Sequence, residues 1–231
     1  MVPVRKDPSG LILVLGGARS GKSTFAERFA ARQAAGRVTY LATSETNDPE
    51  MTARVSAHRA GRPAAWTTVE CPLEVAAAVR ATAALARDAS APVRDAPAPV
   101  FLLDCVTFWI SNLMFAAGDL GGTVPEGLGN FDKAFIAPEV EDAVARRVTG
   151  ALDDLLVALR ETGSTLIAVS NEVGLGIVPE YPIARLYRDE LGRANRRLAE
   201  AADEAYLLVA GIPLELKALA VDPFAGQENQ E

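Results

Sequence analysis

The stretch of sequence that decides the fold covers residues 11–23 and reads Leu11-Ile12-Leu13-Val14-Leu15-Gly16-Gly17-Ala18-Arg19-Ser20-Gly21-Lys22-Ser23. Its first five residues form a continuous aliphatic run, which is typical of a strand buried on both faces of a parallel sheet. Its last eight residues match the pattern G-x-x-x-x-G-K-[ST] in full. Helix-forming residues follow from Lys22 to Ala35, and Gly36 is placed to end that helix. A buried strand, a glycine turn and a helix in this order predict a phosphate-binding loop.

The loop also predicts how a triphosphate is bound. Its glycines let the backbone wrap tightly, so that the N–H groups point at phosphate oxygens. The positive N-terminal end of the following helix adds to the attraction. We expect Lys22 to reach the β- and γ-phosphates and the Ser23 hydroxyl to bind Mg²⁺. A chance glycine turn is the alternative, and the strand before it and the helix after it argue against that interpretation.

Beyond the loop, predicted strands and helices alternate along the chain. Further strands are expected at residues 38–42, 66–69, 100–103, 165–169 and 205–210, and further helices at 48–60, 72–87, 105–115, 139–161 and 183–202. This alternation predicts an α/β protein with the P-loop NTPase fold, in which helices flank a mostly parallel central sheet. We expect one nucleotide-binding domain over residues 11–217, with a disordered extension at 1–10, flexible segments near 88–99 and 118–138, and a tail at 218–231.

The charge of the sequence argues against a nucleic-acid partner. The 231 residues carry a formal net charge of −7, and no basic stripe is present that could neutralise nucleic-acid phosphates. Arg193, Arg196 and Arg197 cluster, but Glu190 and Glu200 flank them, which predicts a solvated helix face. We therefore expect no nucleic-acid partner.

The sequence also predicts a cytoplasmic protein without a membrane span. Cys71 and Cys105 are the only cysteines, and they are far apart and in no metal-binding spacing. No apolar run reaches the roughly 18 residues that indicate a transmembrane helix. Residues 1–10 are too short and too polar for a signal peptide.

Asp104 is a candidate metal ligand, and His58 is a candidate nucleophile. Asp104 ends an aliphatic strand, which is the position of the acid that helps to hold Mg²⁺ opposite the loop serine. Its alternative role is the N-cap of the following helix. His58 is the only histidine, and Arg59 and Arg62 beside it could meet a polyphosphate. A neutral imidazole can attack phosphorus, but the spacing alone also allows an idle surface histidine.

Two further groups allow two interpretations each. Residues 170–172 (Ser-Asn-Glu) follow a predicted strand at its carboxyl end, where they could contact substrate near the γ-phosphate or form a helix cap and turn. Arg185, Arg188 and Asp189 could meet a substrate or a neighbouring subunit. Equally, they could form a surface ion-pair set that contributes little to stability.

Several blocks in order carry a resemblance to a known family. They are the loop at 16–23, Ala42-Thr43-Ser44, Asp48-Pro49-Glu50-Met51, Arg54, His58-Arg59, Gly61-Arg62-Pro63, Trp66, Glu70-Cys71, Asp104-Cys105-Val106-Thr107, Ser111-Asn112-Leu113, residues 170–179, Arg188-Asp189 through Asn195, Ala202-Asp203-Glu204 and Ala210-Gly211-Ile212-Pro213. With them the sequence resembles the bifunctional adenosylcobinamide kinase / adenosylcobinamide-phosphate guanylyltransferase family of cobalamin biosynthesis. The resemblance covers nearly the whole chain from Leu11 to Lys217.

The resemblance implies two reactions and a set of site residues. A nucleoside triphosphate, ATP or GTP, phosphorylates adenosylcobinamide; GTP then gives GMP to adenosylcobinamide phosphate through a GMP–histidine intermediate, which matches His58. The positions that match the family's guanine-nucleotide contacts are Thr43, Ser44, Arg59, Ala60, Gly61, Arg62, Pro63, Glu70 and Asp104. Family members form trimers, so the resemblance also implies a homotrimer.

The residues leave two other functions open beside this one. One is a P-loop small-molecule kinase in which His58 is idle. The other is a nucleotide-gated binding module that keeps the loop but does not turn over. The sequence also departs from some relatives, which carry two adjacent histidines where Ala57 and His58 stand here. The segments at 88–99 and 118–138 look longer than the family minimum.

Overall fold

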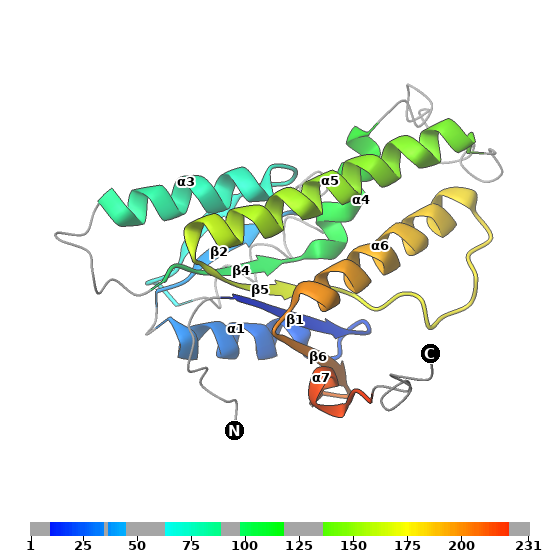
Figure 1. Cartoon of the computed structure of the whole chain (residues 1–231). Coiled ribbons are helices and arrows are strands. Elements are labelled where there is room, and N and C mark those ends of the chain that lie inside the picture. Colours follow the sequence, from blue (N-terminus) through cyan, green and yellow to red (C-terminus); the bar gives the residue numbers. More distant parts are fainter. Residues whose placement is uncertain (1–9, 35–36, 45–62, 89–97, 118–135, 222–231) are drawn as a thin grey trace, which may run out of the picture.

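The structure is a computed structural model that describes residues 10–34, 37–44, 63–88, 98–117 and 136–221 (Figure 1). One seven-stranded sheet has the strand order β3-β2-β4-β5-β1-β6-β7. The strands are β1 (Gly10–Gly16), β2 (Thr39–Ala42), β3 (Thr67–Glu70), β4 (Val100–Asp104), β5 (Thr165–Val169), β6 (Glu204–Val209) and β7 (Ile212–Glu215). Every pair of neighbouring strands is parallel except β6 and β7. The predicted mostly parallel sheet is therefore confirmed.

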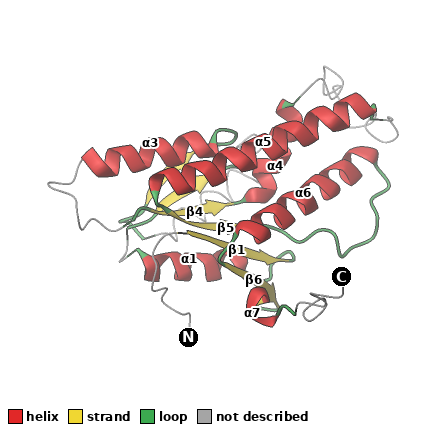
Figure 2. Cartoon of the chain, viewed as in Figure 1, coloured by secondary structure: helices red, strands yellow, loops and turns green. Residues whose placement is uncertain are grey.

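Helices cover both faces of this sheet (Figure 2). They are α1 (Lys22–Gln33), α3 (Val75–Asp88), α4 (Val106–Ala116), α5 (Pro138–Thr162), α6 (Pro182–Ala201) and the short α7 (Leu216–Leu219). Helix α1 packs on one face, against the side chains of Ile12 and Val14. Helices α3, α4, α5 and α6 pack on the other, against Leu11 and Leu13. Successive β1 residues point to opposite faces, which explains why a continuous aliphatic run is needed there.

The strand order decides where the candidate residues meet. Strand β5 pairs with β1 on one side and with β4 on the other. The carboxyl ends of β1 and β4 are thus at one edge, two strand spacings or about 10 Å apart. With the phosphate loop leaving β1 at that edge, the chain has the P-loop NTPase fold.

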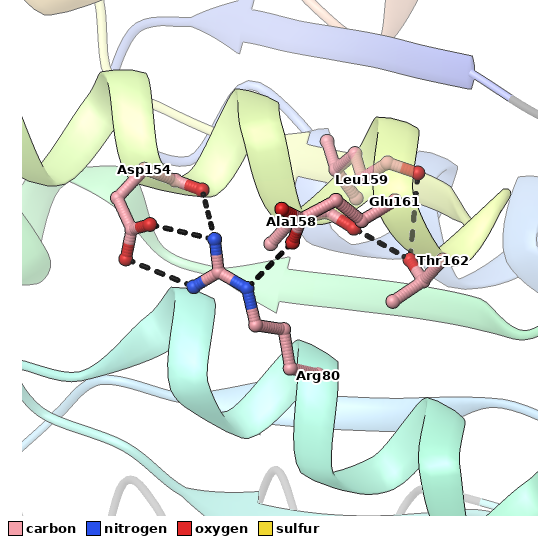
Figure 3. A network of polar contacts seen from close by, with 6 residues as sticks. All are labelled: Arg80, Asp154, Ala158, Leu159, Glu161 and Thr162. Carbon is pink, nitrogen blue, oxygen red and sulfur yellow. Dashed lines mark hydrogen bonds and ion pairs between the residues drawn. The ribbon is translucent and has the colours of Figure 1, made fainter.

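An ion-pair network joins two of the covering helices. Arg80 of α3 donates to Asp154 of α5 through Nη2 (2.7 Å) and to Glu161 through Nε (2.8 Å), as Figure 3 shows. These carboxylates raise the pKa of Arg80 above its ordinary value. All three side chains are substantially exposed, so solvent screens the pairs and their contribution to stability is small.

The end of the sheet differs from the expectation. The sequence predicted a last strand at 205–210 and a tail beyond Lys217, whereas the structure adds antiparallel β7 and then α7, which ends at Leu219. Ala210 (φ 51°) and Gly211 (φ 83°) form the tight connection from β6 to β7. Both residues have positive φ, which suits a two-residue hairpin, but alanine at such a position carries no sequence signal. Pro213 lies in β7, in keeping with an edge strand.

Some predicted boundaries were also wrong. Asp88, which the sequence placed in the flexible segment near 88–99, is the last residue of α3. Pro138, which it placed in the segment near 118–138, is the first residue of α5. The helix expected from Pro72 begins at Val75. Most of both segments, like residues 1–9 and 222–231, lies outside the described part of the chain.

The prediction of a solvated face on α6 is wrong for one residue. Glu190 is only 1% exposed. It lies four residues after Leu186 and four before Ala194, both buried, and so falls on the stripe that packs on the sheet. Its carboxylate pairs with Arg193, while Arg197 forms an ion pair with Asp153 of α5 at the surface.

Among the helices of the described ranges, none has both the length and the apolar character needed to cross a bilayer.

Candidate active site

Gly16, the first residue of the phosphate loop, is closely surrounded by other atoms. A Cβ atom at this position would lie 2.6 Å from Leu208 O and 2.6 Å from Ser20 Oγ. Its φ of 154° is also a value that other residues rarely adopt. Leu208 belongs to β6, which pairs with β1 at this point. The loop can therefore start against the neighbouring strand only because residue 16 has no side chain.

Lys22 is the buried cation of the loop. The side chain is 8% exposed, and its Nζ donates to Gly17 O at 2.7 Å. Burial lowers the pKa of Lys22, while the nearby Cys105 and Asp104 side chains act in the opposite direction. The Asp104 carboxylate is thus within electrostatic reach of the lysine, although β5 lies between their strands. The hydrogen bond to Gly17 O thus holds the ammonium at the loop, where a bound phosphate would lie.

The loop serines fit a triphosphate and its metal. Ser20 Oγ is buried and has no hydrogen-bond partner among the described residues. The Ser20 carbonyl accepts from Gly211 N (3.1 Å), which fastens the loop to the β6–β7 turn. Ser23 lies in the first turn of α1 and is partly exposed. A buried loop hydroxyl without a partner suits phosphate oxygens, since buried polar groups are normally satisfied.

Asp104 lies half-buried at the carboxyl end of β4. The alternative role as N-cap is wrong, because Cys105 occupies the N-cap position of α4. The peptide bond between Asp104 and Cys105 is cis. In the sheet register Ala42 pairs with both Asp104 and Glu70, so the ends of β4, β2 and β3 lie side by side. No group of three or more His, Cys, Asp or Glu residues that could hold a metal occurs in the described ranges.

A polar network fixes the end of β2. Thr43 Oγ1 accepts from Cys105 N (3.0 Å) and donates to Cys105 O (2.7 Å). Asn112 Nδ2 donates to Thr43 O (2.8 Å) and to Pro72 O (3.0 Å). One amide on α4 therefore ties together the segments that follow β2 and β3. Sequence reasoning missed this role of Asn112, for which the only signal was its place in a family block.

Residues 170–172 hold the edge of the site together. Ser170 is fully buried, and its Oγ donates to Asn195 Oδ1 (2.6 Å). Asn195 Nδ2 donates to Asn171 O (2.9 Å), and Asn171 N donates to Thr107 Oγ1 (3.0 Å). The interpretation of this segment as a helix cap is wrong, because α6 begins only at Pro182. The turn is present: Glu172 Oε1 accepts from Gly174 N (2.7 Å).

The segment that contains His58 and the arginines of α6 are the other predicted groups of the site. Residues 45–62, with His58, Arg59, Ala60, Gly61, Arg62 and the helix expected at 48–60, lie outside the described residues. Ser44 and Pro63, at the two ends of that stretch, are half-buried and exposed respectively. Arg185 Nη1 donates to Pro179 O (3.1 Å) and Glu180 O (2.5 Å), and Arg188 pairs with the adjacent Asp189 (3.3 Å).

Comparison with known proteins shows the family to which the chain belongs. The family described as cobinamide kinase / cobinamide phosphate guanyltransferase matches residues 12–216. The bifunctional adenosylcobalamin biosynthesis protein CobU of Salmonella typhimurium is 41% identical over 207 residues, which cover 90% of this chain and 99% of that protein. The corresponding protein CobP of Pseudomonas aeruginosa is 37% identical over 205 residues, covering 89% and 96%.

Two further similarities complete the comparison. CobU of Escherichia coli is 37% identical over 207 residues, covering 90% of this chain and 99% of that protein. Among solved structures, the flagellar accessory protein FlaH of Methanocaldococcus jannaschii matches with a TM-score of 0.39 and 15% identity, covering 88% of this chain and 74% of that chain. The family match and the full-length relatives show that the chain belongs to the cobinamide kinase / cobinamide phosphate guanyltransferase family.

Proposed function

We propose that this chain phosphorylates adenosylcobinamide with a nucleoside triphosphate and then transfers GMP from GTP to adenosylcobinamide phosphate, giving adenosyl-GDP-cobinamide and pyrophosphate. The observation that carries the proposal is the phosphate loop, with its buried Lys22 and with Asp104 within electrostatic reach of that lysine, in a chain of this family. Residues 11–217 would act as one domain, because all seven strands belong to one sheet.

In the kinase step the loop positions the triphosphate. Loop N–H groups and the Lys22 ammonium neutralise the phosphate oxygens. The cobinamide hydroxyl attacks the γ-phosphorus and releases its proton to solvent, as the bond to the leaving nucleoside diphosphate breaks. Ser23 and Asp104 would hold Mg²⁺, which usually takes one or two protein ligands together with substrate phosphates. When bound, the ion neutralises charge on the phosphates. Either ATP or GTP can serve as donor in this scheme.

In the guanylyl step His58 is the proposed nucleophile. Its neutral imidazole attacks the α-phosphorus of GTP, a P–N bond forms, and pyrophosphate leaves. A phosphate oxygen of adenosylcobinamide phosphate then attacks the same phosphorus, and the P–N bond breaks to free the imidazole. The proposed guanine-nucleotide contacts are Thr43, Ser44, residues 59–63, Glu70 and Asp104. The adjacent ends of β2, β3 and β4 support this set, since Ser44, Glu70 and Asp104 follow or end those strands.

The assembly and the location stay predictions. A homotrimer follows from the family resemblance, and its measured mass in solution would test it. The cytoplasmic location expected from the sequence awaits localisation of the protein in cells.

One experiment separates the proposed function from its two alternatives. The protein is incubated with GTP labelled at the α-phosphorus, and an adduct that is labile in acid and stable in base is sought. Label that disappears in His58→Ala supports the transferase. Phosphorylation of cobinamide without any protein label would leave a simple kinase, and nucleotide binding with neither outcome would leave a binding module.

A further inference from the structure

The loop between β5 and α6 exposes aliphatic side chains. Leu175 is 87% exposed, Ile177 97% and Val178 60%. Single exposed aliphatic residues are common on protein surfaces, but three within four consecutive positions make a local apolar patch. We call Leu175, Ile177 and Val178 the aliphatic patch. No part of the chain that the structure describes packs over these three side chains. We therefore expect a ligand or a partner to contact them.

Hydrogen bonds hold this loop in place at both ends. Near its start, Gly174 N donates to the side chain of Glu172 (2.7 Å). Near its end, the guanidinium of Arg185 donates to Pro179 O and Glu180 O. A surface that is already ordered loses less conformational entropy when it binds a ligand. The patch therefore has the preorganisation expected of a binding surface.

The loop starts at the phosphate site. Glu172 N donates to the carbonyl of Gly16, the first residue of the phosphate loop, at 3.2 Å. Leu175 is three residues further on and so lies within roughly 10 Å of Glu172. Figure 1 shows this loop leaving the carboxyl end of β5 and running outward to the start of α6. The aliphatic patch therefore begins within roughly 10 Å of a residue that is hydrogen-bonded to the phosphate loop.

We propose that the aliphatic patch binds the apolar face of the corrin macrocycle of the acceptor. This inference rests on the proposed function, which supplies that acceptor. In the kinase step the acceptor hydroxyl has to come within about 3–3.5 Å of the terminal phosphorus. The macrocycle attached to it is far larger than the hydroxyl arm, so it must lie on surface next to the phosphate loop. A broad ring with apolar faces matches exposed aliphatic side chains, and burying both removes apolar area from water.

The test compares a double substitution in the patch with a matched control elsewhere. Leu175→Ser/Ile177→Ser should raise the dissociation constant for cobinamide at least tenfold, measured by equilibrium dialysis with the visible absorbance of the corrin. The KM for cobinamide should rise by the same factor, with kcat and the affinity for the nucleotide within twofold of wild type. Leu85→Ser on α3, where Leu85 is 70% exposed, should change none of these values. Both variants should keep the wild-type melting temperature, because the replaced side chains are on the surface.

The outcomes are distinct. An unchanged dissociation constant for cobinamide in Leu175→Ser/Ile177→Ser overturns the inference while leaving the proposed function intact. A weaker affinity that is accompanied by a lower mass in sedimentation equilibrium also overturns it, because the patch is then an interface between copies of the chain. If the wild-type protein failed to phosphorylate cobinamide, the proposed function would fall. Dialysis would still decide whether the patch binds the corrin ring.

Discussion

Replacing Gly16 with alanine should destabilise the protein, because the new side chain would clash with the neighbouring strand and strain the backbone. The new Cβ would lie 2.6 Å from Leu208 O, a backbone atom of β6 that cannot move without disturbing the sheet. Overpacking of this kind costs about 1–3 kcal/mol. A backbone conformation with φ of 154° adds about 1–3 kcal/mol for a residue other than glycine. The free energy of unfolding should therefore fall by about 4 kcal/mol.

The neighbouring glycine is the control. At Gly17 a Cβ would meet no atom within 4 Å, so Gly17→Ala should change stability by less than about 0.5 kcal/mol. For a chain of this size, a loss of about 4 kcal/mol corresponds to a fall in melting temperature of roughly 8–16 °C. The assay is thermal unfolding followed by circular dichroism, with both variants and the wild type measured without nucleotide. Equal melting temperatures for Gly16→Ala and Gly17→Ala would refute the close-packing argument.

Four other predictions can be checked with the same protein. Lys22→Ala should lower both activities about 100-fold or more, because the ammonium faces phosphate in either reaction; guanylylation at the wild-type rate would contradict a shared site. Asn112→Leu should cost about 2–4 kcal/mol in urea unfolding, because two part-buried carbonyls lose their donor; an unchanged midpoint would show that the network is dispensable. Arg80→Met should leave the melting temperature nearly unchanged, and any difference should vanish in salt of about 1 M, where the screening length is about 3 Å. Burial raises the pKa of Cys71 to about 11, while an unfolded thiol titrates near about 8.5. The unfolded chain therefore loses this proton first, and the free energy of unfolding should fall as the pH rises from about 9 to about 11; the fall should be smaller in Cys71→Ala.

Much of the fold follows from local sequence patterns. Strands β1, β4 and β5 were predicted because strands covered on both faces need continuous aliphatic runs, and the loop at 16–23 needs glycines at fixed positions. Strand β7 could not be predicted, since its turn depends on Ala210 at a positive φ and its sequence includes Pro213. Helix α6 shows the limit of inferring exposure from charge. Glu190 is charged, yet its spacing from apolar neighbours places it on the packing stripe.

The candidate site divides in the same way. The phosphate loop and Asp104 could be predicted because each lies directly at the end of a strand that is easy to recognise. The role of Asn112 could not, because it bonds to carbonyls 40 and 69 residues away in sequence. Which residues meet at such a distance depends on the strand order, and no local pattern records that order. The placement of His58 stays a prediction.

Trp109 gives the protein its own optical signal. Trp109 lies in α4 and is 1% exposed. Its indole Nε1 donates to Leu73 O at 2.8 Å. The chain has only two tryptophans, so Trp66→Phe leaves Trp109 of α4 as the single tryptophan emitter. Fluorescence from this variant should shift to the red on unfolding, and any movement of α4 during turnover should be visible in stopped flow without an attached dye.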